Sequence, residues 1–427
     1  MKKLISIMLI LSLAMTVFIG CGTKNEDDKK TDTNNTQEND TAADEKVTFE
    51  FWHGYSADKA EVLDEFITEY EKANPNVKVN AKFVAAGGEM LQKVQAAIIS
   101  DTLPDMLWGY PTWTGVLESS GKLVEIETLM DEEYKKDIPE GLLNAGKYDE
   151  KIYSVPIEAG TLYMIYNKDM FDEAGITEVP TTWDELYDVA KKLTNDEHKG
   201  IWLPIALNER TTWTWECFLW QNGQDLLSPD YKEITFNNEK GLEALQTYTK
   251  FITDGVAPLT VGQDPFIDKD VAIIYGTQGA ANAYIKKYNM NVGVAMLPGK
   301  EKLATGLGSN HYFLFNNDEK KEKAAFDFIK WMTTGDTNAS WAMKSGYLPV
   351  SVSGRESEKY QEFGIENPHY IEAAKALAYG VARPPIEEYP KLSDLIAATI
   401  EKIAYGSLTP EEGMDEIVKG AKNIFSN

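Results

Sequence analysis

The segment Val47-Thr48-Phe49-Glu50-Phe51 opens the part of the chain that determines the fold. Its apolar residues alternate with polar ones, which is typical of a half-buried strand. Apolar residues at helical spacing follow over residues 62–70, and Asn74-Pro75-Asn76 ends that helix. Residues 77–83 alternate again, and a further helix leads to a short strand at 105–108. This strand–helix–strand–helix–strand order predicts a parallel, doubly wound α/β sheet.

The same kind of pattern begins again after residue 159. Residues 160–167 alternate as a strand, and Thr182-Trp183-Asp184-Glu185-Leu186 opens a helix with a threonine cap and acidic residues in its first turn. Further strands are expected at 291–297 and 312–315, with several helices toward the C-terminus. The chain is long enough for two domains, so we expect two α/β lobes.

The N-terminus has the parts of a secretory signal. Met1-Lys2-Lys3 precedes an apolar stretch of 16 residues, 4–19, which is shorter than the roughly 20 residues of a membrane-spanning helix. Gly20-Cys21-Gly22 follows, and a cysteine directly after the cut resembles a bacterial lipobox. We expect a signal peptide over 1–20 and lipidation of Cys21. The alternative is an ordinary signal peptide with an incidental cysteine, since Phe18 stands where leucine is usual.

Residues 23–45 contain no aromatic and no large aliphatic side chain. Such a segment cannot bury enough apolar surface to offset the entropy of ordering, so residues 21–45 are predicted to be a disordered tether. A lipid on one cysteine attaches a protein to a membrane without spanning it. The chain is therefore expected at the membrane through its lipid anchor only.

Composition narrows the function classes further. A formal net charge of −26 disfavours nucleic acid and anionic lipid surfaces as partners. The four histidines are far apart and show no zinc spacing, so no metal is expected. With Cys21 lipidated, the only other cysteine, Cys217, has no disulfide partner and is predicted to be a small buried apolar residue.

Several stretches together carry a family resemblance. They are Phe51-Trp52-His53, Leu103-Pro104-Asp105-Met106, Ile165-Tyr166-Asn167-Lys168-Asp169-Met170-Phe171, Thr182-Trp183-Asp184-Glu185-Leu186 and Ser345-Gly346-Tyr347-Leu348-Pro349-Val350. In this order they resemble the extracellular solute-binding proteins of ABC importers, the group that contains maltose-binding protein and glycerophosphodiester-binding proteins. The resemblance implies a monomer with a type II periplasmic-binding-protein fold.

In that fold two doubly wound lobes are joined by a hinge that the chain crosses several times. The resemblance places the N-terminal lobe at 46–157 plus 304–350 and the C-terminal lobe at 158–303 plus 351–427. Ligand would lie in the cleft between the lobes, which agrees with the rule that open α/β sheets bind ligands beyond the carboxyl ends of their strands.

A sugar cleft pairs flat aromatic rings with polar side chains. At predicted strand ends the chain offers His53, Tyr55, Trp108, Tyr110 and Trp113. In the second lobe, residues 208–216 form the densest aromatic–polar cluster, with either Trp213 or Trp215 as a sugar platform. The expected ligand residues there and in the positions that the resemblance implies are Glu89, Trp213, Trp215, Glu216, Gln278, Asn310, Tyr347 and Arg383.

These features predict a receptor without enzymatic activity that captures a short xylo-, manno- or gluco-oligosaccharide for the permease subunits of an ABC importer. A Gram-positive host is expected, and neither metal nor cofactor is implied. One alternative is a receptor for a glycerophosphodiester or sugar phosphate, which Tyr347 and Arg383 favour. Another is a secreted glycoside hydrolase, because 68 acidic residues can supply a catalytic pair.

Overall fold

The structure is a computed structural model that describes residues 46–205, 209–260 and 264–426. The predicted signal peptide (1–20) and tether (21–45), including Cys21, lie outside the described residues.

The first sheet has the strand order β12-β11-β3-β1-β2, and β6 pairs with β11 as well. Its strands are β1 (Val47–His53), β2 (Val77–Phe83), β3 (Met106–Gly109), β6 (Ser154–Thr161), β11 (Thr305–Leu314) and β12 (Gly380–Ala382). β1 runs parallel to both β2 and β3, as the sequence predicts, whereas β11 is antiparallel to β3 and β6. The doubly wound prediction is therefore confirmed for β1, β2 and β3.

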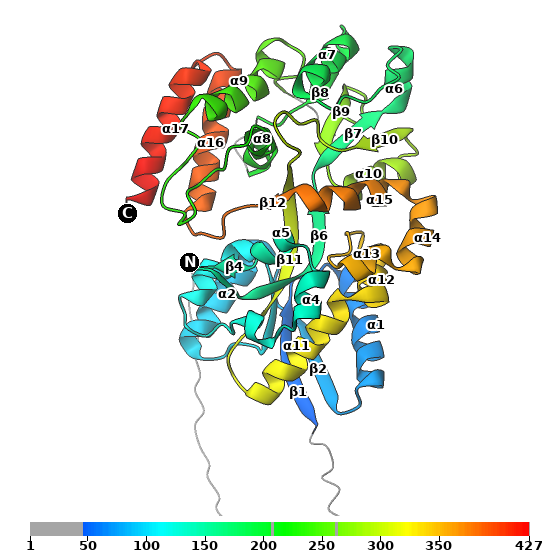
Figure 1. The fold of residues 1–427 in the computed structure, drawn as a ribbon, viewed down its shortest axis with the longest axis vertical. Coiled ribbons are helices and arrows are strands. Elements are labelled where there is room, and N and C mark those ends of the chain that lie inside the picture. The colour runs from blue at the N-terminus through cyan, green and yellow to red at the C-terminus, as the bar shows by residue number, and fades with distance from the viewer. Residues whose placement is uncertain (1–45, 206–208, 261–263, 427) are drawn as a thin grey trace, which may run out of the picture. The chain divides into compact units, whose positions relative to one another are not determined.

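Helices pack along this sheet and around its edges (Figure 1). α11 lies against β1, and α1 lies against β2. The helices of this region are α1 (Ala57–Ala73), α2 (Gly87–Ser100), α3 (Thr114–Glu118), α4 (Glu132–Asp137), α5 (Glu140–Asn144), α11 (Glu319–Thr333) and α12 (Gly335–Ser345), with short 3₁₀ turns η1 (Pro111–Trp113) and η2 (Ile126–Leu129). A small hairpin joins β4 (Lys147–Tyr148) to β5 (Lys151–Ile152).

The second sheet has the order β10-β7-β9-β8. Its strands are β7 (Tyr163–Asn167), β8 (Lys199–Trp202), β9 (Val271–Gly276) and β10 (Val292–Ala295). The helices that follow these strands or pack beside them are α6 (Lys168–Glu173), α7 (Trp183–Leu193), α8 (Glu209–Gln221), α9 (Glu239–Thr253), α10 (Gln278–Lys286), α16 (Tyr389–Ala404) and α17 (Pro410–Phe425). Thr182 caps α7 in a reciprocal capping box with Glu185, as its sequence indicates.

Two predicted strands differ in extent from the observed ones. The stretch 160–167 is divided at Leu162, because the chain leaves the first sheet after β6 and enters the second at β7. Of the predicted strand 312–315, residues 312–314 form the C-terminal end of the ten-residue β11, and Phe315 follows it in an isolated bridge with Leu123. Gly306, Gly308 and Ser309 interrupt the apolar alternation in its first half, so the sequence pattern does not reveal it.

The helices α13 (Val352–Glu356), α14 (Glu358–Glu366) and α15 (Pro368–Ala376), followed by η3 (Leu377–Tyr379), continue the chain after α12. α13 and α14 pack against α12, whereas α15 packs against β10 and α10. Residues 352–366 thus contact a helix of the first group, although the expected lobe boundary at 351 assigns them to the second lobe.

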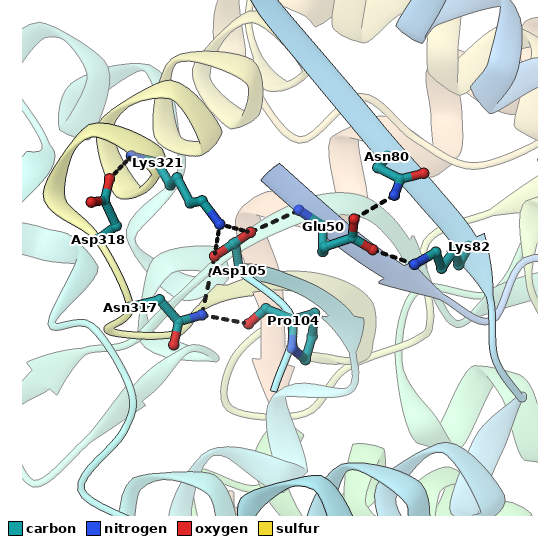
Figure 2. A network of polar contacts seen from close by, with 8 residues as sticks. All are labelled: Glu50, Asn80, Lys82, Pro104, Asp105, Asn317, Asp318 and Lys321. Atoms are coloured by element: carbon teal, nitrogen blue, oxygen red, sulfur yellow. Dashed lines mark hydrogen bonds and ion pairs between the residues drawn. The ribbon is translucent and has the colours of Figure 1, made fainter. Parts of the chain in front are cut away.

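A buried carboxylate joins the loops at one end of the first sheet (Figure 2). Asp105, 5% exposed, accepts a hydrogen bond from the backbone N–H of Glu50 at 2.8 Å and one from Nδ2 of Asn317 at 3.1 Å. The ammonium of Lys321 lies 3.3 Å from the same carboxylate. Asp105 therefore links β1, the loop before β3 and the segment after β11.

The cluster expected to bind ligand on α8 divides between the two faces of that helix. Trp215 is 0% exposed, and its ring centroid lies 5.3 Å from that of Phe236. Glu216 is also 0% exposed and accepts a hydrogen bond from the hydroxyl of Tyr389 on α16 at 3.1 Å. Both side chains are therefore placed in the core between helices, whereas Trp213 lies on the other face of α8.

Burial raises the pKa of the Glu216 carboxyl to about 8, although Arg383 and the Tyr389 hydroxyl both favour the charged form. Cys217, next in sequence, is buried as predicted, and burial raises the pKa of its thiol to about 12.

Replacing Asp105 with alanine should lower the free energy of unfolding by about 3 kcal/mol, because it leaves a buried N–H, an amide and an ammonium without their acceptor. Urea denaturation followed by circular dichroism measures this loss. Glu69→Ala removes an exposed carboxylate from α1 and serves as the matched control. Equal stability of the two variants would show that the Asp105 contacts are dispensable.

The buried Glu216 carboxyl should make stability depend on pH. Between its ordinary pKa of 4.5 and about 8, the folded state holds a proton that the unfolded state has lost. The free energy of unfolding therefore falls as pH rises through this window, by about 1.4 kcal/mol per pH unit at most. Glu216→Gln keeps the acceptor for Tyr389 and should abolish this slope relative to the parent chain. Parallel stability curves for the two proteins from pH 5 to 8 would contradict the assignment.

Candidate functional site

A cavity of about 420 Å³ lies among β6, β11 and the ends of several helices. The side chains and backbone that line it come from segments far apart in the sequence. They are Lys59, Tyr110, Gly160, Trp213, Thr277, Gln278, Gly279, Asn282, Gly308, Ser309, Asn310, Ser345, Gly346, Tyr347, Tyr370 and Arg383. The wall thus combines four aromatic rings with amides, hydroxyls and two cationic side chains.

Trp213 lies on the face of α8 opposite to the buried Trp215. Its indole rests against β11, where a Cβ atom at Gly306 would stand only 2.1 Å from the indole Nε1. Glycine at this position therefore makes room for the ring. The guanidinium of Arg383 lies 5.4 Å from the centre of the same ring. The Trp213 Nε1 is buried against β11 and has no hydrogen-bond acceptor among the described residues.

A β-bulge between β6 and β11 shapes the opposite wall. Asn310 pairs with Glu158, but the next residue, His311, pairs with Pro156, so β6 has one extra residue here. Bulges of this kind bend a strand and redirect its side chains. The Asn310 amide donates to Glu158, which also accepts from the Trp341 indole at 3.3 Å.

Glu158 is 1% exposed and lies behind the cavity wall. Burial raises the pKa of its carboxyl, while the charge of Lys59 and the hydrogen bonds from Asn310 and Trp341 act in the opposite direction. Its contacts hold the Asn310 amide in one orientation, which in turn presents that amide to the cavity.

Tyr347 provides a second aromatic surface, from the segment after α12. The ammonium of Lys59, in the first turn of α1, lies 4.0 Å from the centre of the Tyr347 ring. Burial raises the pKa of the Tyr347 hydroxyl above its usual range, so the group is a neutral hydrogen-bonding hydroxyl.

Gln278 begins α10 and is 2% exposed. Its Nε2 reaches the carbonyl of Ala159 at 3.5 Å and that of Gly346 at 3.4 Å. Its Oε1 is buried and accepts no hydrogen bond from the part of the chain that the structure describes. The carboxamide therefore keeps an unpaired acceptor within the wall, packed beside Gly160.

Arg383 follows β12 and forms an ion pair with Glu209 at the start of α8. A second cavity of about 380 Å³ adjoins the first and shares Trp213, Thr277 and Arg383 with it. The two cavities thus meet at Trp213 and Arg383.

Six of the expected ligand residues line the cavity: Tyr110, Trp213, Gln278, Asn310, Tyr347 and Arg383. Four others, His53, Tyr55, Trp108 and Trp113, are buried in the core and do not line it. The Tyr55 hydroxyl lies 3.2 Å from that of Tyr312, and the Tyr55 ring packs 5.3 Å from Trp108. These rings lie behind Tyr110, so the structure does not bring them to this cavity.

Glu89 is also displaced from its expected position. It lies exposed in the first turn of α2 and forms an ion pair with Lys93 at 3.1 Å. The acidic residue beside the cavity wall is instead Glu158, which the sequence pattern did not single out. Sequence reasoning likewise missed Lys59, Thr277, Asn282, Ser309 and Tyr370. Of these, Thr277 is the N-cap of α10 and Asn282 lies in its second turn, so both are close in sequence to the expected Gln278.

Within the described ranges, no cluster of three or more His, Cys, Asp or Glu side chains is arranged to hold a metal ion. No helix among the described residues is long and apolar enough to cross a membrane.

Comparison with known proteins places the chain in one family. The structure of the cyclic α-maltosyl-1,6-maltose binding protein from Arthrobacter globiformis matches with a TM-score of 0.84 and 28% identity, covering 89% of this chain and 99% of that one. The substrate-binding protein Lmo0181 from Listeria monocytogenes, solved with cycloalternan, matches with a TM-score of 0.70 and 25% identity over 89% and 98% of the two chains.

Among sequence relatives, the sn-glycerol-3-phosphate-binding periplasmic protein UgpB of Salmonella typhimurium is 22% identical over 89% of this chain and 92% of its own. These similarities confirm the two-lobed α/β fold class that the sequence predicts. Residues 65–370 match the model of the bacterial extracellular solute-binding proteins. Because that match spans most of the chain, the protein belongs to the bacterial extracellular solute-binding protein family.

Proposed function

We propose that this protein is a receptor on the outer face of the cytoplasmic membrane that captures a short oligosaccharide and delivers it to the permease subunits of an ABC importer. Family membership supports the capture of a solute outside the cell. The similar structures include binding proteins for a cyclic maltosyl-maltose and for cycloalternan. A ligand built from several sugar rings also suits two adjoining cavities.

The observation that carries this proposal is the pairing of aromatic rings with neutral hydrogen-bonding groups around one cavity. Trp213 and Tyr347 come from distant segments, and the amides of Gln278 and Asn310 line the same cavity. Burying one sugar face of about 60 Å² on a ring contributes about 1.5 kcal/mol. Two such faces and several hydrogen bonds closed off from water are sufficient for micromolar affinity, about −8 kcal/mol.

The cavity also favours binding over hydrolysis. A glycoside hydrolase needs two carboxyl groups on either side of the scissile bond. None of the described residues that line the larger cavity is Asp or Glu, and Glu158 lies behind its wall in contact with Asn310 and Trp341. The adjoining cavity has a single acidic residue among its described lining residues, Glu209, and that carboxylate is paired with Arg383. We therefore propose that the ligand leaves chemically unchanged and that neither metal nor cofactor takes part.

A glycerophosphodiester or sugar phosphate is the second candidate ligand. Lys59 and Arg383 both line the cavity, and UgpB, a relative over most of the chain, is a binding protein for sn-glycerol 3-phosphate. These two cations favour this alternative, because a phosphate group forms strong charge-assisted hydrogen bonds with lysine and arginine side chains.

Capture requires that the lobes close around the ligand. We propose that the lobes follow the expected division, 46–157 plus 304–350 and 158–303 plus 351–427, except that residues 352–366, which pack against α12, belong to the first lobe. Ligand shifts the population toward the closed form by its differential affinity, on the order of 5 kcal/mol for a nearly complete switch. We further propose that the protein is a monomer, that a lipid on Cys21 anchors it to the membrane, and that its host is Gram-positive.

A thermal-shift screen tests the function directly. The panel contains xylo-, manno-, gluco- and arabino-oligosaccharides and glycerophosphocholine. A true ligand at a hundredfold excess over its dissociation constant should stabilise the protein by about 2.7 kcal/mol. Small-angle scattering should then show a more compact molecule, and the oligosaccharide should show no new reducing ends. Cleavage of the sugar would favour the hydrolase instead.

Replacing Trp213 with alanine should weaken binding of the ligand from that screen at least tenfold, since it removes one stacking surface. Gly306→Ala should weaken binding in the same direction, because its methyl group would displace the indole. Isothermal titration calorimetry measures both. Trp331→Ala, on α11 and outside the cavity wall, is the matched control. Unchanged affinity in both site variants would remove Trp213 from the binding surface.

A further inference from the structure

Lys59 occupies an unfavourable place in its helix. It lies in the first turn of α1, where the partial positive charge of the helix N-terminus disfavours a cation. Its ammonium nevertheless faces the cavity over the Tyr347 ring. In the described part of the chain no carboxylate forms an ion pair with it. Burial raises the pKa of the Glu158 carboxyl, and the charge of Lys59 lowers it. The Glu158 oxygens, however, accept hydrogen bonds from Asn310 and Trp341 and form no ion pair with Lys59.

The N-terminus of α10 reaches the same end of the cavity. Thr277 is its N-cap and, among the described residues, makes no capping hydrogen bond with its side chain. The first backbone N–H groups of a helix have no partner within the helix and attract anions. Gln278, whose Nε2 contacts the carbonyl of Gly346 next to Tyr347, adds a buried and unused Oε1. Lys59, Tyr347 and this helix end thus all line the same cavity.

The charge of this wall contrasts with the charge of the whole protein. The chain carries a formal charge of −26, yet the only charged side chains among the described lining residues are Lys59 and Arg383. Arg383 already forms an ion pair with Glu209. Of these two cations, Lys59 is therefore the one without an ion pair among the described residues. A ligand that displaces water from the cavity would leave its ammonium without a countercharge, unless the ligand itself is anionic.

We infer that the surface formed by Lys59, Tyr347 and the N-terminus of α10 binds an anionic group carried by the sugar, either the carboxylate of a uronic acid or a phosphate ester. This inference rests on the proposed function and specifies the ligand class of the same cavity. The anion meets the Lys59 ammonium and the free N–H groups of α10. A hydroxyl on the same sugar donates to the Gln278 Oε1.

A neutral sugar satisfies this surface less well. Closing the cavity around it would strip water from the Lys59 ammonium without supplying a countercharge, and such burial is costly. An anionic group supplies that charge through hydrogen bonds that are shorter and stronger than neutral ones. The aromatic rings of Tyr347 and Trp213 still bind the apolar faces of the sugar.

Calorimetry with matched probes tests the inference. The probes are xylotriose with and without a glucuronosyl branch, glucose against glucose 6-phosphate, and sn-glycerol 3-phosphate. We expect at least one anionic probe to bind ten times more tightly than its neutral counterpart in 50 mM salt. That advantage should shrink in 500 mM salt, where charges are screened over shorter distances. The carboxylate and phosphate arms identify which anion is preferred.

Variants of Lys59 separate its charge from its bulk. Lys59→Gln should lower the ratio of anionic to neutral affinity about tenfold, and Lys59→Arg should largely preserve that ratio. Lys72→Gln makes the same change of net charge at the other end of α1, about 20 Å along the helix axis, and should leave the ratio unchanged.

An anionic preference that disappears in Lys59→Gln supports the inference. Neutral probes that bind as tightly as anionic ones, or a ratio unaffected by Lys59→Gln, would overturn it while leaving a sugar receptor in place. If no probe in this panel or in the thermal-shift screen binds, the proposed function fails together with the inference.

Discussion

The pairing of β6 with β11 is the constraint on which the site depends. β11 pairs with three strands of the first sheet and also packs against α8 of the second group of elements. Its residues 308–310 line the cavity, and Gly306 gives space to Trp213. The bulge opposite Asn310 turns that amide toward Glu158. One strand pair thus positions a polar wall and seats an aromatic ring, and a shift in its register would displace both.

Local patterns were sufficient for most elements of the fold. Alternation at 47–51 and 77–83, and the stop at Asn74-Pro75-Asn76, mark β1, β2 and the end of α1 because each depends on neighbouring residues. The same holds for the capping box of Thr182. The first half of β11 escaped prediction because its glycines are set by contacts with α8, which are distant in sequence.

Site residues were harder to predict because burial is decided by tertiary packing. Trp213 and Trp215 look alike in sequence, but residues two apart on a helix point to nearly opposite faces, so one can reach the cavity while the other fills the core. Tyr55 and Trp108 lie at the ends of strands as expected. They pack against each other, and Tyr55 also packs against Trp341, so both are buried in the core. In the sequence, Lys59 is indistinguishable from a solvent-exposed lysine of an amphipathic helix. Only the structure shows that its ammonium lies over the ring of Tyr347, a residue distant in sequence.

Two buried carboxyl groups, those of Glu158 and Glu216, lie close to the two cations that line the cavity. Glu158 lies near Lys59, and Glu216 lies near Arg383, yet neither forms an ion pair with its cation in the part of the chain that the structure describes. Burial moves both groups toward their neutral forms, and Asn310, Trp341 and Tyr389 satisfy their oxygens. An ionised carboxylate in contact with Lys59 would compete with a ligand for the same ammonium. Because Glu158 is hydrogen-bonded to Asn310 and Trp341 behind the wall, the Lys59 ammonium remains able to interact with a ligand in the cavity.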